Sequence, residues 1–519
     1  MNIVDEKDLK QEYEEHEVAP DGVLRHGQTV DLETYSNDDE EFGGYENRKK
    51  MERKLLWKTD ARFAIMIIIY ILNYIDRNNV PAARHQGLED DLELGYDNRY
   101  ETVLSILYAG YIVMQVPSNG IVSLISRPSL YIGGAMALWG MISCLTGITQ
   151  NYVGILLTRL FLGFVEAAFL PGAMFLLSKW YKKNELGVRM TLLYCGNLIS
   201  NAFGNLIAAG IVNGMEGKLG HRAWRWLFYI EGALTIFVAV CAVFVLPDFP
   251  ETERFLSPLE RKLAIRRMAE DAGQVDTVMD KHEVLRGMKM ALLDYRVWWL
   301  SLTLFGMVIG LSFNIYFPTL TEEMGFEGTQ ALLMCAPPWI FATIVAFPWS
   351  VSSDRFQERT FHILVSNLVS IVGFIIAIAT QNKAARYFSL FLMTLGYCGF
   401  ICVYAFTSSS FIRPTSRRSV AIAFVNAFSN IGNIAGSYIW DADKFGPSGY
   451  RQSYAICISC TGLSCFLILG FRYILVNLNK KIEKLEEEYP GMDPWDIPEK
   501  CDRKLDNALL VKRGFRYML

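Results

Sequence analysis

Residues 63–84 read FAIMIIIYILNYIDRNNVPAAR, an almost uninterrupted apolar run that leads into an adjacent acid and base, Asp76 and Arg77. A helix that starts near Phe63 needs about 20 residues to cross a bilayer, so both charges fall inside the membrane, beyond its midpoint. An ionised Asp or Arg near the centre of a span costs roughly 2.5–3.5 kcal/mol, and such residues usually face a wet cavity or each other. The stretch therefore predicts a helix that lines a transport pathway. A salt bridge that caps the outer end of the span is the plainer alternative.

The composition of the chain is that of a protein with many membrane spans. Of the 519 residues 52% are hydrophobic and 20% are charged, and the apolar residues come in long blocks. About twelve blocks reach the roughly 20 residues that a bilayer requires. The predicted spans are 63–79, 101–121, 129–149, 152–177, 186–212, 226–246, 297–320, 330–350, 361–380, 387–408, 420–440 and 453–476. The formal net charge of −4 is too small to suggest nucleic acid as a partner.

A polar connection divides the predicted spans six and six. It contains residues 257–271, SPLERKLAIRRMAED, whose apolar positions predict a short amphipathic helix on the inner membrane surface. We expect five parts: an N-terminal tail (1–59) with the composition of disordered segments, a six-helix bundle (60–246), a central loop (247–294), a second six-helix bundle (295–477) and a C-terminal tail (478–519). The short loops carry almost no bias in Lys and Arg, but the tails and the central loop predict that both termini are cytoplasmic.

An internal repeat supports this division. The fifth span contains NAFGN from Asn201 to Asn205, and the eleventh contains NAFSN from Asn426 to Asn430, 225 residues later. Matching spans that are six crossings apart run in the same direction, as in the parallel repeats of many transporters. Both spans carry asparagines at helical spacing, and helix packing and cavity lining both remain open as roles for this stripe. Asn201 and Asn430 are our candidates for substrate contact.

The fourth span carries a second acid and base. Arg159, Gly163 and Glu166 lie at i, i+4 and i+7, so the two charges share one helical face about 10 Å apart. The same block contains Pro171, which predicts a kink because proline lacks the N–H that an internal helical hydrogen bond requires. The repeat counterparts of the first and fourth spans carry Asn314, Tyr316, Tyr397 and Tyr404 and no charge. Charge is therefore concentrated in the first bundle.

This arrangement suggests a coupling mechanism. When both acids are ionised, the charges of Asp76, Arg77, Arg159 and Glu166 sum to zero, and protonation of a carboxyl leaves a positive site that attracts an anion. Protons and an anion are then expected to bind together. No histidine falls inside the core of a predicted span, so a carboxyl is the better proton carrier.

Five fragments of the chain carry a resemblance to a known family. They are 70–79 (YILNYIDRNN), 159–167 (RLFLGFVEA), 224–232 (WRWLFYIEG), 246–250 (LPDFP) and 353–356 (SDRF). Together they resemble the anion:cation symporter family of the major facilitator superfamily, and within it the fungal allantoate permease group. The resemblance implies a fold of twelve transmembrane helices in two six-helix bundles and proton-coupled uptake of small organic anions.

The resemblance also implies roles for single residues. Asp76 and Glu166 match the proton-coupling carboxyls, Arg77 the contact to the substrate anion, and Arg159 the fourth-span arginine of the superfamily. Asp354 and Arg355 match the gating motif between spans eight and nine, for which an ordinary surface ion pair at a helix end is the plainer alternative. The loop after the second span, 119–127, departs from the pattern because it lacks the Asp-Arg dipeptide.

Aromatic side chains are expected to shape the substrate site, because Tyr hydroxyls can hydrogen-bond carboxylates and amides. The candidates in spans that surround the expected cavity are Tyr70, Tyr74, Tyr108, Tyr111, Trp139, Phe313, Tyr316, Tyr397 and Tyr404. Nine of the 10 cysteines lie within or near spans without a nearby His or carboxylate, so we expect no metal and no cofactor. Phosphate-binding and hydrolase motifs do not appear in the sequence, which disfavours an ATP-driven pump or an enzyme.

The sequence as a whole predicts a monomeric proton/organic-anion symporter of the plasma membrane that works by alternating access. Its expected partners are protons, the lipid bilayer and a small carboxylate or sulfonate such as allantoate or a vitamin acid. Two alternatives are a facilitator or exchanger of the same fold and a nutrient receptor that does not transport. The facilitator or exchanger would need no protonatable acid, and a longer signalling tail would indicate the receptor. The two buried acids and the short tails favour the symporter.

Overall fold

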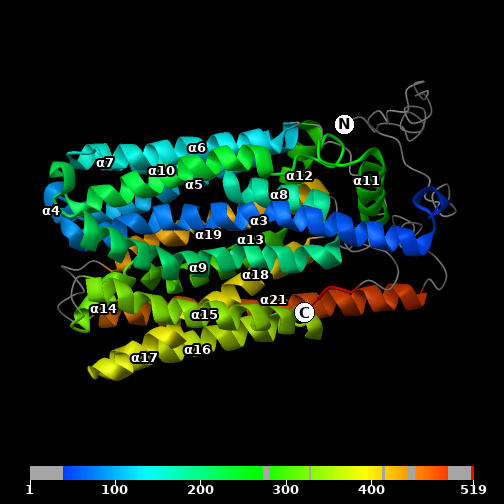
Figure 1. The fold of residues 1–519 in the computed structure, drawn as a ribbon. Coiled ribbons are helices and arrows are strands. Elements are labelled where there is room, and N and C mark those ends of the chain that lie inside the picture. Colours follow the sequence, from blue (N-terminus) through cyan, green and yellow to red (C-terminus); the bar gives the residue numbers. More distant parts are fainter. Residues whose placement is uncertain are drawn as a thin grey trace, which may run out of the picture.

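The computed structural model describes residues 39–125, 127–272, 281–326, 329–411, 415–440, 450–488 and 516–518. Within these ranges every regular element is a helix, and there is no strand. The long helices lie side by side in one elongated bundle, with α6 and α7 at one edge and α16 and α17 at the other (Figure 1). Nine helices among the described residues are long and apolar enough to cross a bilayer. The predicted all-α membrane fold is confirmed.

The helices of the N-terminal half match the first six predicted spans. They are α3 (Tyr45–Ala83), α5 (Arg99–Leu124), α6 (Pro128–Thr146), α7 (Tyr152–Glu166), α8 (Phe169–Trp180), α9 (Lys183–Met215) and α10 (Ala223–Val245). Short elements lie before and between them: η1 (Asp39–Phe42), η2 (Arg84–Leu88), α4 (Glu89–Asp91) and η3 (Lys218–Gly220).

Helix α3 starts well before the predicted span. Residues 45–59, which we expected in a disordered tail, form its first turns, so the expectation is wrong for this part of the tail. The segment is rich in Lys, Arg and Glu, which favour helices. Lys58 Nζ also donates to Glu260 Oε1 over 2.5 Å, which ties the extension to the central connection. Residues 1–38 lie outside the described residues.

The predicted kink in the fourth span is confirmed as a break between α7 and α8 at Ala167 and Ala168. The break lies four residues before Pro171, where the missing proline N–H leaves the Ala167 carbonyl without its helical donor. Helix α7 therefore ends at Glu166, which lies at the break itself.

The helices of the C-terminal half match the other six predicted spans. They are α13 (Tyr295–Gly310), η4 (Ser312–Asn314), α14 (Phe317–Glu323), α15 (Thr329–Phe356), α16 (Thr360–Ala379), α17 (Lys383–Thr394), α18 (Gly396–Ser410), α19 (Thr415–Ile439) and α21 (Arg451–Glu488). The seventh span is interrupted around η4, and the tenth is interrupted at Leu395. The break after Thr394 lies 228 residues beyond the break after Glu166, close to the spacing of the sequence repeat.

The two halves pack mainly on themselves and meet along two helix pairs. In the N-terminal half α6 packs on α10, α5 on α7 and α3 on α9, and in the C-terminal half α13 packs on α19 and α16 on α21. The halves meet where α9 contacts α15 and where α5 contacts α19. Thr191 and Ser350 share a hydrogen bond of 2.9 Å in the first pair, and Tyr438 bonds Thr102 and Ser105 in the second.

The central connection contains α11 (Pro258–Ala272) and α12 (Lys281–Leu293). The predicted helix over residues 257–271 is thus confirmed as α11. Its buried face packs on the protein, because Leu263 is fully buried and Arg267 donates to Glu185 at the start of α9 over 2.7 Å.

The last described residues return to the end of the C-terminal half. Helix α21 continues beyond the last predicted span, and the first residues of the expected C-terminal tail, up to Glu488, belong to it. Asn479 on this extension exchanges hydrogen bonds with the backbone of Tyr517, at 2.8 and 2.9 Å, and the Tyr517 hydroxyl accepts from Arg296 Nη1 at 3.3 Å.

Candidate functional site

A central cavity lies between the two halves, and the space free of atoms at this site, including the part open to solvent, is about 750 Å³. It is lined from the N-terminal half by α3, α5, α8 and α9, and from the C-terminal half by α13, η4, α18 and α19. The lining side chains are Tyr70, Tyr74, Arg77, Asn78, Tyr108, Tyr111, Leu170, Tyr194, Asn197, Val308, Leu311, Ser312, Asn314, Ile315, Tyr397, Phe400, Tyr404, Asn426, Ser429, Asn430 and Asn433. A cavity with a polar and aromatic lining suits a small polar solute.

Nine of the predicted site residues line this cavity, and six of them are aromatic: Arg77, Asn314, Asn430, Tyr70, Tyr74, Tyr108, Tyr111, Tyr397 and Tyr404. The Arg77 guanidinium lies 4.6 Å from the centre of the Tyr111 ring and 5.2 Å from that of Tyr74. Cation–π contacts of this kind attract a guanidinium to the faces of aromatic rings and help to hold it in place. Arg77 is therefore a fixed positive charge at the cavity wall.

Arg77 is paired with Glu166 and not with its sequence neighbour. Its Nε donates to Glu166 Oε2 over 2.6 Å, and the Glu166 side chain is fully buried. The other carboxylate oxygen, Oε1, has no hydrogen-bond partner among the described residues. Because the pair joins α3 to the end of α7, the alternative of an Asp76–Arg77 bridge at the end of the span is wrong.

Asp76 points away from the cavity, between α3 and α6. Its Oδ1 accepts from Ser143 Oγ at 2.7 Å, while Oδ2 is buried without a partner among the described residues. Arg159 reaches the same place but donates from Nη1 to the Asp76 backbone carbonyl at 3.2 Å. The Asp76 carboxyl is thus buried, 1% exposed, with a single neutral donor.

Arg159 is the second cation of the site and lies behind Arg77. It lines a smaller cavity of about 340 Å³ together with Arg77 and Tyr108. Its Nε and Nη2 atoms are buried without hydrogen-bond partners in the described part of the chain, and its guanidinium lies 5.6 Å from the Phe228 ring centre. The guanidiniums of Arg77 and Arg159 therefore border adjoining cavities, and Arg159 has two N–H donors without partners among the described residues.

The asparagine stripes hold the cavity wall together and also line it. Asn201 does not line the cavity, but it accepts from Asn78 at 2.6 Å and donates to Asn197 at 3.1 Å, and both of these residues do. On α19, Asn433 donates to Asn430 Oδ1 at 3.0 Å. Packing and cavity lining, which the sequence left open, are both present.

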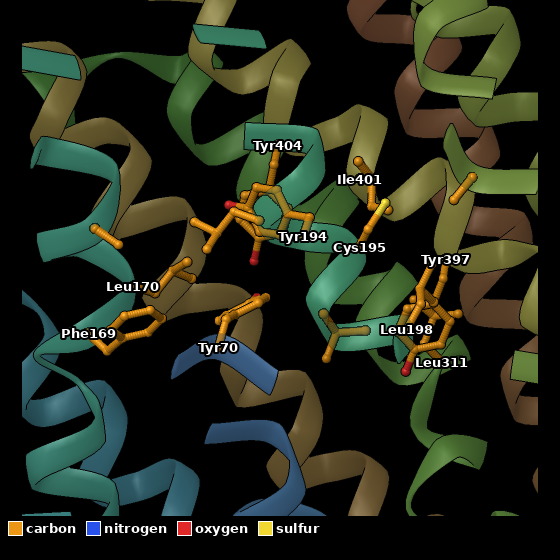
Figure 2. Packing of buried hydrophobic residues seen from close by; sticks show 14 of the residues in the cluster. Tyr70, Phe169, Leu170, Tyr194, Cys195, Leu198, Leu311, Tyr397, Ile401 and Tyr404 are labelled. Carbon is orange, nitrogen blue, oxygen red and sulfur yellow. The ribbon is translucent and has the colours of Figure 1, made fainter. Parts of the chain in front are cut away.

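Several cavity residues escaped the sequence prediction, among them Asn78, Tyr194 and Phe400. Tyr194 on α9 stacks on Tyr404 of α18 with ring centres 4.9 Å apart, and Figure 2 shows this pair above Tyr70. The available signal was its position three residues before Asn197, on the same face as the polar stripe.

Three predicted aromatics pack elsewhere. Trp139 is fully buried against Phe169, and Phe313 stacks on Trp339. The Tyr316 hydroxyl donates to the Ser437 carbonyl at 2.8 Å. Each of these rings fills space between helices outside the set that lines the cavity.

The expected gating residues lie at the end of α15. Asp354 accepts from Arg359 Nη2 at 2.5 Å, whereas Arg355 is exposed in the last turn of the helix. Arg359 is buried, and its Nε lies 3.0 Å from the sulfur of Met518, so the docked C-terminal residues reach this ion pair. The carboxylate of the motif therefore pairs across the turn to α16.

The family model for the major facilitator superfamily matches residues 66–437. An MFS transporter prlL from a fungal species is 32% identical over 81% of this chain and 87% of its own length. A major facilitator-type transporter hxnP from Emericella nidulans is 27% identical over 84% and 88%, and a putative tartrate transporter from Agrobacterium vitis is 28% identical over 76% and 90%.

Solved structures agree on the fold. A bacterial homologue of the human lysosomal transporter Spinster, in an inward-facing and unoccupied conformation, has a TM-score of 0.59 at 17% identity and covers 80% of this chain and 97% of its own. The helical architecture, the central cavity between two halves and these matches lead to one conclusion: the chain belongs to the major facilitator superfamily, and it is a multi-pass membrane transporter and not an enzyme.

Proposed function

We propose that this transporter imports a small organic anion together with protons. The observation that carries the proposal is the buried Arg77–Glu166 pair at the wall of the central cavity, 2.6 Å between Nε and Oε2. A buried ion pair that lies beside a solute cavity offers one cation to two competing anions, the protein carboxylate and the substrate. We propose that proton binding and substrate binding are coupled because Glu166 and the substrate anion compete for Arg77.

The anion is held by Arg77, with Arg159 behind it. The cavity adds neutral groups from both halves, including Tyr74 and Asn78 from α3, Asn314 from η4 and Asn430 from α19. A carboxylate or sulfonate can accept from the guanidinium while these amides and hydroxyls bind the remainder of the solute. The charge and the size of the cavity support a small carboxylate or sulfonate as substrate.

The coupling step is a proton transfer to Glu166. When a proton binds to the Glu166 carboxylate, its attraction to Arg77 falls, and the Arg77 N–H groups become available to the substrate carboxylate. When the substrate leaves, Arg77 again favours the ionised form of Glu166, and the proton is released. Asp76, buried beside Ser143 and below Arg159, is the second proton carrier in this scheme.

Alternating access requires contacts that can open on each side of the cavity. Tyr194 and Tyr404 stack across the halves at one end, together with the Thr191–Ser350 bond. Tyr100 and Tyr316 contact each other across the halves at the other end, 6.2 Å between ring centres. We propose that these two sets separate in turn, with Asp354 and Arg359 acting on the first side, and that both termini face the cytoplasm of a plasma-membrane protein.

The name of one relative supports an anionic substrate. This relative is called a putative tartrate transporter, and tartrate is a small dicarboxylate. Together with the resemblance to allantoate permeases, this name agrees with a cation at the cavity wall. A facilitator or exchanger of the same fold would have no need of two buried carboxyls, so it is the alternative that the experiment has to exclude.

The test is uptake by purified protein in liposomes. A panel of small carboxylates and sulfonates is supplied with an inward-directed proton gradient and then without it. Accumulation that requires the gradient supports symport and identifies the substrate. Equilibration regardless of the gradient would establish a facilitator, and binding without uptake would establish a receptor.

A further inference from the structure

Glu231 is a further carboxyl buried in the N-terminal half, and the coupling scheme above does not use it. It lies on α10 and is 2% exposed. Neither of its carboxylate oxygens has a hydrogen-bond partner among the described residues. Helix α10 packs closely on α6 here: a Cβ atom on the next residue, Gly232, would lie 2.7 Å from the Gly140 carbonyl oxygen. The carboxyl is therefore enclosed by protein.

The groups around Glu231 include one carboxyl and no cation partner. The Asp76 carboxyl and the Asn79 amide of α3 are its electrostatic neighbours, and the Asn79 Nδ2 atom also lacks a partner within the described ranges. From α6, Ser143 donates to Asp76, and the Cys144 sulfur lies against Gly232.

Among the described residues, no arginine near α10 makes a hydrogen bond to the Glu231 carboxyl. Arg159 of α7 reaches α10 through the ring of Phe228, one turn before Glu231. η2 and α9 also pack on α10, but Arg84 of η2 pairs with Glu89 at 2.7 Å and Arg189 of α9 pairs with Asp60 at 2.8 Å. Glu231 therefore faces a like charge without a direct counterion.

The balance of charge among the carboxyls and guanidiniums near Glu231 indicates which carboxyls hold a proton. Three carboxyls, Asp76, Glu166 and Glu231, accompany two guanidiniums, Arg77 and Arg159, so full ionisation would leave one uncompensated negative charge. An unpaired buried charge is far more costly than the neutral acid, and neighbouring carboxylates resist joint ionisation. Glu166 has Arg77 as its partner, which leaves Asp76 and Glu231 to hold the proton between them.

We propose that Glu231 is a further proton-binding residue of this transporter and shares one exchangeable proton with Asp76. This proposal rests on the proposed function, because the shared proton is one of those carried with the anion. In the transfer an O–H bond breaks at Glu231 and forms at the Asp76 carboxylate, and the negative charge moves from Asp76 to Glu231. Asp76 lies next to Arg77 in the chain, so the transfer links α10 to the cavity wall.

The direct test needs no substrate. Infrared spectra of the purified full chain are recorded across a pH series, and the stretching band of protonated carboxyls is followed in H₂O and D₂O. We expect this band at neutral pH in the native protein and the loss of one carboxyl's share of it in Glu231→Gln, which keeps the shape of the neutral acid. A band of unchanged intensity and pH dependence in Glu231→Gln would overturn the proposal.

The variant Asp76→Asn provides a second test of the proposal if Glu231→Gln does not fold. In Asp76→Asn the neighbouring negative charge is gone, so Glu231 should lose its proton at lower pH and the midpoint of the band should shift downward. An unchanged midpoint in Asp76→Asn would also overturn the proposal. Glu323→Gln, on α14 beside Arg386, is the control and should leave the midpoint where it is.

Transport measurements separate this proposal from the proposed function. Once a substrate is known, Glu231→Gln should carry fewer protons per anion than the native protein while still exchanging substrate. If the native protein proves to be uncoupled, the proposed symport fails even where the infrared band identifies a protonated Glu231. If the native protein is coupled and Glu231→Gln has the native stoichiometry, Glu231 is not part of the proton path.

Discussion

The Nε atom of Arg77 on α3 donates to Oε2 of Glu166 at the end of α7 over 2.6 Å, and this contact joins the first and fourth spans at the edge of the central cavity. Arg77 is also surrounded by the rings of Tyr74, Tyr108 and Tyr111. The Arg77 guanidinium therefore binds a carboxylate on one side and borders the central cavity on the other.

Glu166→Gln should abolish accumulation driven by a proton gradient while substrate exchange continues. The amide imitates the protonated acid, so Arg77 stays available to the anion and no proton is carried. Uptake and counterflow in liposomes measure the two activities separately. Glu323→Gln is the matched control, because this carboxyl also faces an arginine, Arg386 at 3.6 Å, but lies outside the cavity. Full gradient-driven accumulation by Glu166→Gln would contradict the coupling scheme.

Arg77→Ala should weaken substrate binding by about 10- to 100-fold, since a hydrogen bond to a charged group contributes about 1.5–3 kcal/mol. The change also leaves Glu166 buried without its partner, which destabilises the fold. The double variant Arg77→Ala/Glu166→Gln should recover stability but not affinity, as thermal unfolding and equilibrium binding can measure. Native affinity in the single variant would place the anion elsewhere.

Gly163→Ala should lower the thermal stability of the protein. A Cβ atom at this position would lie 2.0 Å from the Leu107 backbone carbonyl oxygen of α5, so α7 would have to move away. Overpacking of this kind costs about 1–3 kcal/mol. Gly134→Ala, in α6, is the control because nothing lies within 4 Å of its Cβ position, and alanine favours a helix by about 0.5–1 kcal/mol. Equal melting temperatures for both variants would show that the α5–α7 contact tolerates expansion.

Acid should weaken the attachment of the C-terminal residues. Burial raises the pKa of Asp294, but the guanidiniums of Arg296 and Arg417 outweigh burial and hold this pKa below its ordinary value. Asp294 therefore contributes stability above its unfolded pKa, and this contribution is lost as the pH falls through the lowered folded value. Thermal unfolding between pH 7 and a pH below about 4, the ordinary pKa of an Asp carboxyl, should show a smaller loss in Asp294→Asn than in the native chain.

The same cluster predicts a role for Tyr517, whose hydroxyl accepts from Arg296. Tyr517→Phe should cost about 0.5–1.5 kcal/mol in the free energy of unfolding, because the buried Arg296 loses an acceptor. Hydrogen exchange of the end of α21 reports whether the segment remains docked. Native protection in Tyr517→Ala would show that the backbone bonds to Asn479 are sufficient.

The apolar blocks were enough to predict the helices, because a bilayer demands about 20 apolar residues and internally satisfied backbone groups from any span. Pro171 likewise predicted the break after α7 from chemistry that is local to the chain. The interruption at η4, which presents Asn314 to the cavity, had no comparable signal, since Gly310 and Pro318 are tolerated within membrane helices.

The sequence by itself determined that the chain is a helical membrane protein, and it predicted two repeats and the charged residues Asp76, Arg77, Arg159 and Glu166 in spans of the first half. Helical periodicity and hydrophobicity are local properties, and they can be read along the chain. Only the tertiary structure decided that Arg77 pairs with Glu166 while Asp76 turns to Ser143, and that Asp354 pairs with Arg359. The partner of a buried charged side chain depends on which helix faces pack together and on how far along the helices they meet. Residues far apart in the sequence determine this packing together.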